Sequence, residues 1–209
     1  MEKCNNMKKL FGHPDSGHAF KIRFFLIIAG IEHTYEKVDI WIPREQRSAE
    51  FQSVARFGEV PVLLDNGQTY VQSNAILLHL AQQTKAWGGE SPETLSRCTE
   101  WLMWEANKIG MCLPQLRNHA KFGADSDLDA ARDWLIARYK NDISTLSSIL
   151  ADGRTWIIGT EDPSIADFSI CGYLFFAAEA NVHVPALVQT WLDNLAALPG
   201  WKHPYELLA

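Results

Sequence analysis

The stretch between Gly58 and Leu80 constrains the fold more than any other part of the chain. Two β-rich runs, Val60–Leu64 and Gln68–Gln72, lie on either side of the triplet Asp65-Asn66-Gly67. An Asn-Gly pair between two strands is typical of a tight hairpin, because both turn residues must adopt a positive φ angle. We therefore predict two antiparallel strands joined by this turn.

Pro61 and Ser73 add detail to this hairpin. Pro61 has no backbone N–H, so we expect its strand either to lie at the edge of a sheet or to make an unusual turn. Ser73 precedes an apolar stripe at Ile76, Leu77 and Leu80, which predicts a helix with Ser73 as its N-cap. Because helix N-termini attract anions, Ser73 indicates a place for a carboxylate or a phosphate.

These residues carry a family resemblance. The run Val60-Pro61-Val62-Leu63, with Gln72-Ser73-Asn74-Ala75-Ile76 further along, resembles the glutathione site of the cytosolic glutathione transferases. The resemblance implies a cis bond before Pro61 and a Val60 backbone that contacts the cysteinyl part of glutathione. It also implies that Gln72 and Ser73 hold the γ-glutamyl end. The alternative is an ordinary hairpin and capped helix, as in many α/β proteins.

The order of the predicted elements fits the family resemblance. Strand, helix, strand, helix, hairpin and helix follow one another, which matches the thioredoxin-like α/β domain that the resemblance implies for residues 7–84. Residues 1–8 are polar and predicted to be disordered. Besides the hairpin, the predicted elements are the strands Lys9–Gly12 and Thr34–Ile40 and the helices Phe20–Ala29, Glu45–Arg56 and Ser73–Thr84.

The remainder of the chain is helical in pattern. Lys85–Pro92 contains two glycines and a proline and is predicted to be a linker. A capping box, Ser164-Ile165-Ala166-Asp167, opens another helix, as similar boxes do in the transferases. We predict an all-α C-terminal helical domain over residues 92–209. Its clearest helices are predicted at Leu95–His119, Leu128–Leu150 and Leu187–Leu198.

Ser16 is the candidate catalytic residue. Glutathione reacts as a thiolate, whereas a free thiol has a pKa of about 8.5 and is mostly protonated at neutral pH. The resemblance places a Tyr, Ser or Cys donor after the first strand, and Ser16 is the only such residue between Lys8 and Phe20. We predict that Ser16 stabilises the thiolate without being the nucleophile. The alternative is that it only caps the first helix.

The neighbours of Ser16 and three charged residues complete the comparison with the family. Ser16-Gly17-His18 resembles bacterial-type members that carry Ser-Gly-Asn, so His18 departs from that pattern. Arg47, with Arg44 close by, lies where several branches place a cation for the glycine carboxylate. Glu59 would bond the tripeptide backbone or repel its carboxylate. The electrophile site is expected between the domains, with candidate walls at His13, Trp101, Trp104 and Met111.

Composition excludes several classes of partner. The 209 residues carry a net charge of −6 and no Lys/Arg-rich run, which argues against nucleic acid or an anionic membrane. The apolar runs are far shorter than the roughly 20 residues that span a bilayer, and no secretory leader is recognisable. Neither the seven histidines nor Cys4, Cys98, Cys112 and Cys171 show metal-ligand spacing, so we expect reduced thiols and no metal.

The sequence therefore predicts a cytoplasmic, homodimeric glutathione transferase that uses glutathione as co-substrate against small apolar electrophiles. A glutathione-dependent isomerase and a disulfide reductase would use the same glutathione site. A different class is a non-catalytic assembly module, as in the elongation-factor γ subunit. The presence of Ser16, Gln72 and Ser73 together favours an enzyme, because a scaffold does not need all three.

Overall fold

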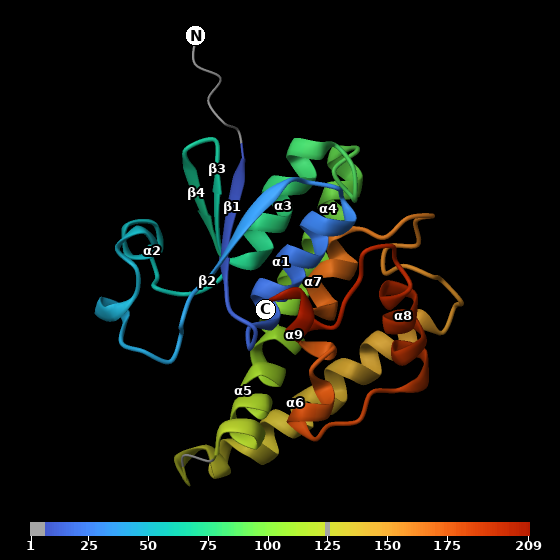
Figure 1. Cartoon of the computed structure of the whole chain (residues 1–209). Helices are drawn as coiled ribbons and strands as arrows, with labels where there is room; N and C mark the ends of the chain where they lie inside the picture. Colours follow the sequence, from blue (N-terminus) through green and yellow to red (C-terminus); the bar gives the residue numbers. More distant parts are fainter. Residues whose placement is uncertain (1–6, 124–125) are drawn as a thin grey trace.

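The protein has a four-stranded sheet on one side and a larger group of helices on the other (Figure 1). The computed structural model describes residues 7–123 and 126–209. The predicted disorder of residues 1–8 therefore falls largely on residues 1–6, outside the described part. Lys8 already belongs to the first strand, so the prediction is wrong there.

The sheet has the strand order β2-β1-β3-β4. β1 pairs parallel with β2 and antiparallel with β3, and β3 pairs antiparallel with β4. β3 is thus internal, so the first of the two alternatives predicted for the Pro61 strand, an edge position, does not hold. Pro61 instead precedes β3 in a cis peptide bond with Val60, which is the unusual turn. The strands are β1 (Lys8–Gly12), β2 (His33–Lys37), β3 (Val62–Asp65) and β4 (Gln68–Val71).

The hairpin between β3 and β4 is confirmed. Asn66 and Gly67 have φ angles of 51° and 74°, as a two-residue turn of this type requires. Asp65 pairs with Gln68 across the turn, which fixes the register of both strands. The hairpin thereby leads the chain from Pro61 to the start of the next helix.

Three α-helices accompany the sheet. α1 (Gly17–Ile28) begins earlier than predicted, whereas α3 (Ser73–Thr84) has the predicted bounds. The predicted helix Glu45–Arg56 is divided into a 3₁₀ turn, η1 (Arg44–Gln46), and α2 (Ala49–Val54). The division falls at Arg47, whose backbone is extended with φ −73° and ψ 165°.

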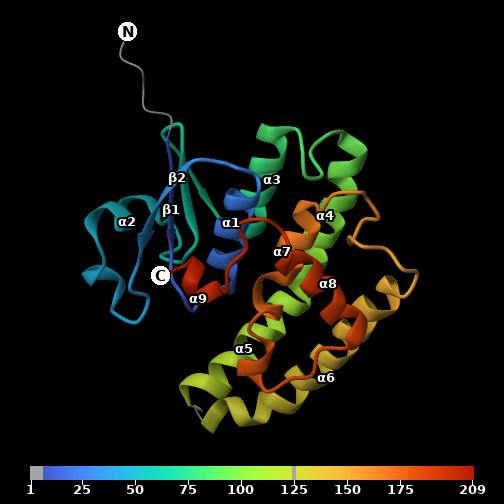
Figure 2. The same cartoon turned by 45° about the vertical axis from the view of Figure 1, so that its right-hand side comes forward.

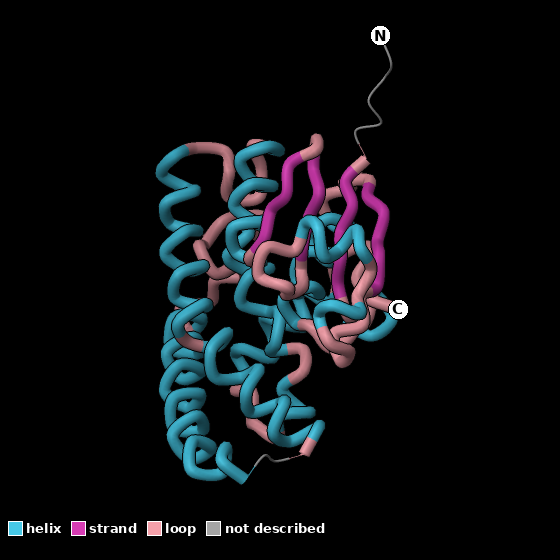
Figure 3. The backbone as a smooth tube through the Cα atoms, turned by 90° about the vertical axis from the view of Figure 1, so that its left-hand side faces the viewer, coloured by secondary structure: helices cyan, strands magenta, loops and turns pink. Residues whose placement is uncertain are grey.

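The helical part follows α3 and lies beside the sheet domain (Figures 2 and 3). The predicted single helix Leu95–His119 is wrong, because Lys108 leaves the helical region with φ −121° and ψ −101° and separates two helices. The elements are α4 (Pro92–Asn107), α5 (Ile109–Phe122), α6 (Ser126–Leu150), α7 (Ile165–Leu174), η2 (Ala177–Ala180), α8 (Ala186–Ala196) and α9 (Pro204–Leu207).

Two glycines allow a close approach of α1 and α7. A Cβ atom on Gly17 would lie 2.8 Å from the carbonyl oxygen of Gly172, and a Cβ atom on Gly172 would lie 2.8 Å from the carbonyl oxygen of Gly17. Any side chain here would push the helices apart. The first turn of α1 is therefore held against the helical part by backbone contact.

A buried polar network also joins the sheet domain to the helical part. Lys21 of α1 is fully buried, and its ammonium group donates to Asn74 Oδ1 at 2.8 Å and to Glu105 Oε2 at 3.2 Å. Asn74 Nδ2 donates to Glu105 Oε2 at 2.9 Å, and the Ser169 hydroxyl donates to Asn74 Oδ1 at 2.8 Å. These four side chains come from α1, α3, α4 and α7, so the network links the sheet domain to the helices.

Three further properties bear on the sequence analysis. Within residues 7–123 and 126–209, no helix combines the length and the apolar character needed to cross a bilayer. The same residues contain no group of three or more His, Cys, Asp or Glu side chains arranged to hold a metal ion. Cys98, Cys112 and Cys171 are buried and unbridged.

The predicted capping box opens α7, and its carboxylate has a central place in the helical core. Asp167 is completely buried. Its Oδ2 atom accepts from the backbone N–H of Ser164 at 2.8 Å. Its Oδ1 atom accepts from the backbone N–H of Ile157 at 2.8 Å and from the indole of Trp191 at 2.9 Å. One side chain thus satisfies donors from α7, the preceding loop and α8.

Replacement of Asp167 by Ala is expected to lower the free energy of unfolding by about 3 kcal/mol, because it leaves several buried donors without an acceptor. Urea unfolding followed by circular dichroism measures this loss. The matched control is Asp193→Ala on the exposed side of α8, with an expected change below about 0.5 kcal/mol. Equal losses in the two variants would contradict the assignment.

Candidate active site

A cavity of about 510 Å³ lies between the sheet domain and the helical part. Its sheet-side wall comes from the loop before α1, the segment around η1, the turn before β3 and the start of α3. Its helical wall is formed by α5 and by Tyr173 of α7. All six residues predicted for the site line this cavity. They are Ser16, Arg47, Glu59, Val60, Gln72 and Ser73.

Ser16 lies immediately before α1 and caps it. Its Oγ atom accepts a hydrogen bond from the backbone N–H of Ala19 at 3.0 Å. A hydroxyl has one proton and two acceptor positions, so this bond uses an acceptor and leaves the proton to donate elsewhere. The two interpretations of Ser16, as cap and as donor towards the cavity, are therefore compatible in one geometry.

Gln72 and Ser73 form the junction between β4 and α3. Gln72 has φ 68° and is the residue before the helix, so the prediction that Ser73 is the N-cap is wrong; Ser73 is the first helical residue. The Gln72 side chain makes no capping bond. Gln72 instead donates through Nε2 to Glu59 Oε2 at 3.2 Å. The helix thus presents its N-terminal N–H groups at the cavity without a side-chain acceptor from its cap residue.

Val60 lies in the turn before β3. The ladder between β3 and β4 ends at the pair Val62 and Val71, so the Val60 backbone lies beyond the last paired residues. Val60 is half-buried and lines the cavity next to Glu59, which is exposed. The peptide bond between Val60 and Pro61 is cis, and both residues line the cavity.

Arg47 and Arg44 differ in how they are engaged. The half-buried Arg47 guanidinium donates to the carbonyl oxygens of Gly58 at 2.7 Å, Ile40 at 3.0 Å and Ile42 at 3.3 Å. It thereby ties the segment after β2 to the turn before β3. Arg44 is exposed, lines the same cavity and lies against Gly58. In the part of the chain that the structure describes, no carboxylate pairs with Arg44.

His18 is a cavity residue that sequence reasoning did not select. Its ring packs edge-on against Tyr173 with centroids 4.9 Å apart, and its Nδ1 atom lies 3.5 Å from the Ser73 hydroxyl. Burial, and then the charge of Lys21, lowers the pKa of His18 to about 4. The imidazole is therefore neutral at physiological pH. The signal in the sequence was its position in the first turn after Ser16.

The helical wall of the cavity differs from the one proposed from sequence. Among the described residues, α5 contributes Gly110, Pro114 and Gln115. The candidates His13, Trp101, Trp104 and Met111 are not part of the lining. Met111 lies beyond the break at Lys108, so its position around the helix axis is not the one that a single continuous helix would give it.

The comparisons with known proteins agree with this architecture. Residues 15–83 match the family model for the glutathione S-transferase N-terminal domain, and residues 117–185 match a domain of unknown function. The solved glutathione S-transferase of Xanthobacter autotrophicus Py2 is 29% identical, with a TM-score of 0.80 over 93% of this chain and 95% of that one. The fold and the matched N-terminal domain define a protein of the glutathione-transferase type.

Curated relatives extend the similarity. The disulfide-bond oxidoreductase YfcG of Escherichia coli strain K12 is 27% identical over 202 residues, which is 90% of this chain and 89% of that protein. A glutathione S-transferase of Dirofilaria immitis is 37% identical over 86 residues, 41% of this chain and 39% of its own length. Residues 15–83 are thus similar to the N-terminal domain of glutathione S-transferases, and the chain as a whole has the fold of their solved structures.

Acidification is expected to destabilise the fold through His18. Because the pKa of His18 is lowered to about 4 in the folded chain from 6.5, the unfolded chain binds an extra proton between these values. The free energy of unfolding should therefore fall as the pH drops from 6.5 towards 4. Urea titrations at a series of pH values measure this slope.

The slope should become shallower in His18→Asn, whereas the exposed His183→Asn serves as the matched control and should keep the wild-type slope. The remaining slope comes from other groups that titrate in this range. If the free energy of unfolding had the same pH dependence in His18→Asn and in the wild type, His18 would not be the group that takes up the extra proton on unfolding.

Proposed function

We propose that this protein is a glutathione transferase that holds glutathione as a thiolate for attack on small apolar electrophiles. The observation that carries the proposal is the position of Ser16. Its hydroxyl lies at the N-terminus of α1 and lines one cavity with Val60, Gln72 and Ser73. The same cavity therefore offers a place for each end of the tripeptide and a donor for its sulfur.

The γ-glutamyl end of glutathione is assigned to the start of α3. The Ser73 hydroxyl and the first N–H groups of this 12-residue helix suit an α-carboxylate, because a helix N-terminus carries partial positive charge. The Gln72 side chain lies beside it. The backbone of Val60 would pair with the cysteinyl unit in the manner of an added strand. The sulfur then lies towards Ser16.

The glycine carboxylate is assigned to Arg44 rather than Arg47. The Arg47 guanidinium donates to three backbone carbonyls. Arg44 lines the cavity without a carboxylate partner among the described residues. Both were candidates on sequence grounds. The Glu59 carboxylate accepts a hydrogen bond from the Gln72 amide at 3.2 Å.

The chemistry follows from this placement. Donation by the Ser16 hydroxyl and the positive end of α1 favour the anion, so the thiol pKa falls below its usual value of about 8.5. The thiolate attacks an electrophilic carbon and forms the C–S bond, while a leaving group such as halide departs with its bonding electrons. The thiol proton passes to solvent. The wall formed by Pro114 and Tyr173 is where an apolar electrophile would lie.

A disulfide reductase is the second candidate function. It is favoured by the similarity to the oxidoreductase YfcG, which extends over 90% of this chain. In addition, a similar structure from Lodderomyces elongisporus is described with two glutathione molecules per subunit. In this reaction one glutathione thiolate attacks a disulfide sulfur and releases a thiol. A second glutathione then attacks the mixed disulfide, which releases the second thiol and glutathione disulfide.

Turnover of chlorodinitrobenzene and of a small symmetrical disulfide, each with glutathione, separates these functions. Glutathione binding without turnover of either substrate would indicate a non-catalytic module instead. The proposal includes a homodimer that acts in the cytoplasm. The net charge of −6 does not suit a nucleic-acid or anionic membrane partner.

Ser16→Ala is expected to leave glutathione affinity largely unchanged and to raise the pKa of the bound thiol by about one unit or more, because the donor to the sulfur is lost. Ultraviolet absorbance of the thiolate, titrated against pH, measures this shift. Ser73→Ala is the matched control: it should weaken glutathione binding with little change in the bound thiol's pKa. An unchanged titration in Ser16→Ala would remove Ser16 from this role.

Arg44→Ala is expected to raise the KM for glutathione roughly tenfold at low salt, because an ion pair with the glycine carboxylate is lost. Thermal stability should stay close to wild type. Arg47→Ala should instead lower the melting temperature, since three backbone carbonyls lose their donor. Steady-state kinetics and thermal unfolding of both variants test the assignment, which is wrong if Arg44→Ala has a wild-type KM.

A further inference from the structure

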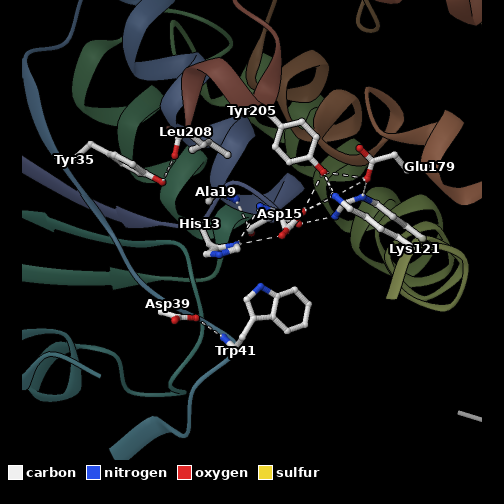
Figure 4. Close-up of polar contacts among 12 residues, drawn as sticks. His13, Asp15, Ala19, Tyr35, Asp39, Trp41, Lys121, Glu179, Tyr205 and Leu208 are labelled. Atoms are coloured by element: carbon white, nitrogen blue, oxygen red, sulfur yellow. Dashed lines mark hydrogen bonds and ion pairs between the residues drawn. The ribbon is translucent and has the colours of Figure 1, made fainter. Parts of the chain in front are cut away.

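A cluster of ionic side chains and one phenol lies beside the loop that carries Ser16 (Figure 4). We call it the Asp15 clamp. Asp15 belongs to that loop, and its partners come from three distant elements: α5, η2 and α9. The members of the clamp are Asp15, Arg117, Lys121, Glu179 and Tyr205.

Arg117 is the most buried member, with 3% of its surface exposed. Its Nη1 atom donates to the backbone carbonyl of Asp15 at 2.7 Å, and Nη2 donates to the Asp15 carboxylate at 2.9 Å. Nε donates to Glu179 at 2.8 Å, and the guanidinium lies 4.2 Å from the ring centroid of Phe176. A planar fork that holds both the carbonyl and the side chain of one residue fixes that residue's backbone.

Tyr205 connects α9 to the same point. Its hydroxyl accepts from Arg117 Nη2 at 2.7 Å and lies 3.0 Å from Asp15 Oδ1 and 3.1 Å from Glu179 Oε2, so its single proton goes to one of these carboxylates. Lys121 donates to Asp15 Oδ1 at 2.8 Å and also contacts the phenol. Figure 4 shows the Tyr205 hydroxyl and Lys121 lying between the carboxylates of Asp15 and Glu179.

The clamp acts next to the reacting centre. Asp15 lines the cavity and is the chain neighbour of Ser16. Although burial opposes ionisation, hydrogen bonds from Lys121 and Tyr205 lower the pKa of Asp15, so the residue stays charged. An unbalanced carboxylate at this position would disfavour a thiolate nearby. The two cations of the clamp, Arg117 and Lys121, balance the charges of its two carboxylates, Asp15 and Glu179, while they hold the loop.

We propose that Arg117 and Tyr205 are positioning residues for Ser16, which act by holding Asp15 and by keeping its negative charge balanced. The proposal rests on the proposed function, because it concerns the same thiolate. On this proposal the helical part, and α9 in particular, helps to position the loop that carries Ser16 on the sheet side of the cavity. The loop residues His13 and Asp15 add a local bond, with the Asp15 N–H donating to His13 Nδ1 at 3.1 Å.

Tyr205→Phe is the main test, because it removes one hydroxyl and keeps every charge. We expect the pKa of the bound glutathione thiol to rise and kcat at neutral pH to fall severalfold, with the KM for glutathione nearly unchanged. Arg117→Gln, which removes the fork and a cation, should raise the thiol pKa by about one unit or more. Ultraviolet titration of the thiolate and steady-state kinetics provide these values.

Arg132→Gln is the matched control, since its side chain is half exposed and pairs only with Asp133 among the ion pairs of the described chain. The thiol of glutathione bound to this variant should have the same pKa as in the wild-type protein. If Arg117→Gln does not fold, Tyr205→Phe decides the question alone. A wild-type thiol pKa in folded Tyr205→Phe overturns the proposal. If wild-type protein forms no thiolate on binding glutathione, the proposed function fails and the proposal fails with it.

Discussion

The buried ammonium group of Lys21 is the interaction on which the arrangement of the molecule depends. A charge removed from water is costly unless it is paired and hydrogen-bonded, so Lys21 requires Glu105 and Asn74 in their observed places. Because these partners come from α4 and α3, the requirement fixes the helical part against the sheet domain. The cavity lies between the same two parts of the chain that this network joins.

Local sequence signals predicted much of the fold. The Asn66-Gly67 turn, the bounds of α3 and the capping box at Ser164 each depend on residues within one turn of one another. The failures occur where distant contacts override the local pattern. Arg47 looks helical in sequence, but its backbone is extended while its side chain bonds three carbonyls. The break at Lys108 interrupts a run of apolar residues whose spacing alone suggests one helix.

The candidate site was predictable where the family motif extends through contiguous residues. Ser16, Val60, Gln72 and Ser73 were found in this way, and they share one cavity. His18 was noticed only as a departure from the motif. Arg117 and Tyr205 carry no motif at all, and only the folded chain brings them to Asp15. No periodicity or spacing rule reports contacts between residues so far apart in sequence.

The backbone contact between α1 and α7 has a consequence for how molecules enter and leave. Because α1 and α7 are in backbone contact at Gly17 and Gly172, they leave no free space at this point for a hinge between the sheet domain and the helical part. Under the proposed function, room for a bulky conjugate would therefore come from the segment that carries Ile40 and Arg44, which lines the cavity. If the protein is the transferase proposed above, the rate at which this segment moves would set an upper bound on turnover.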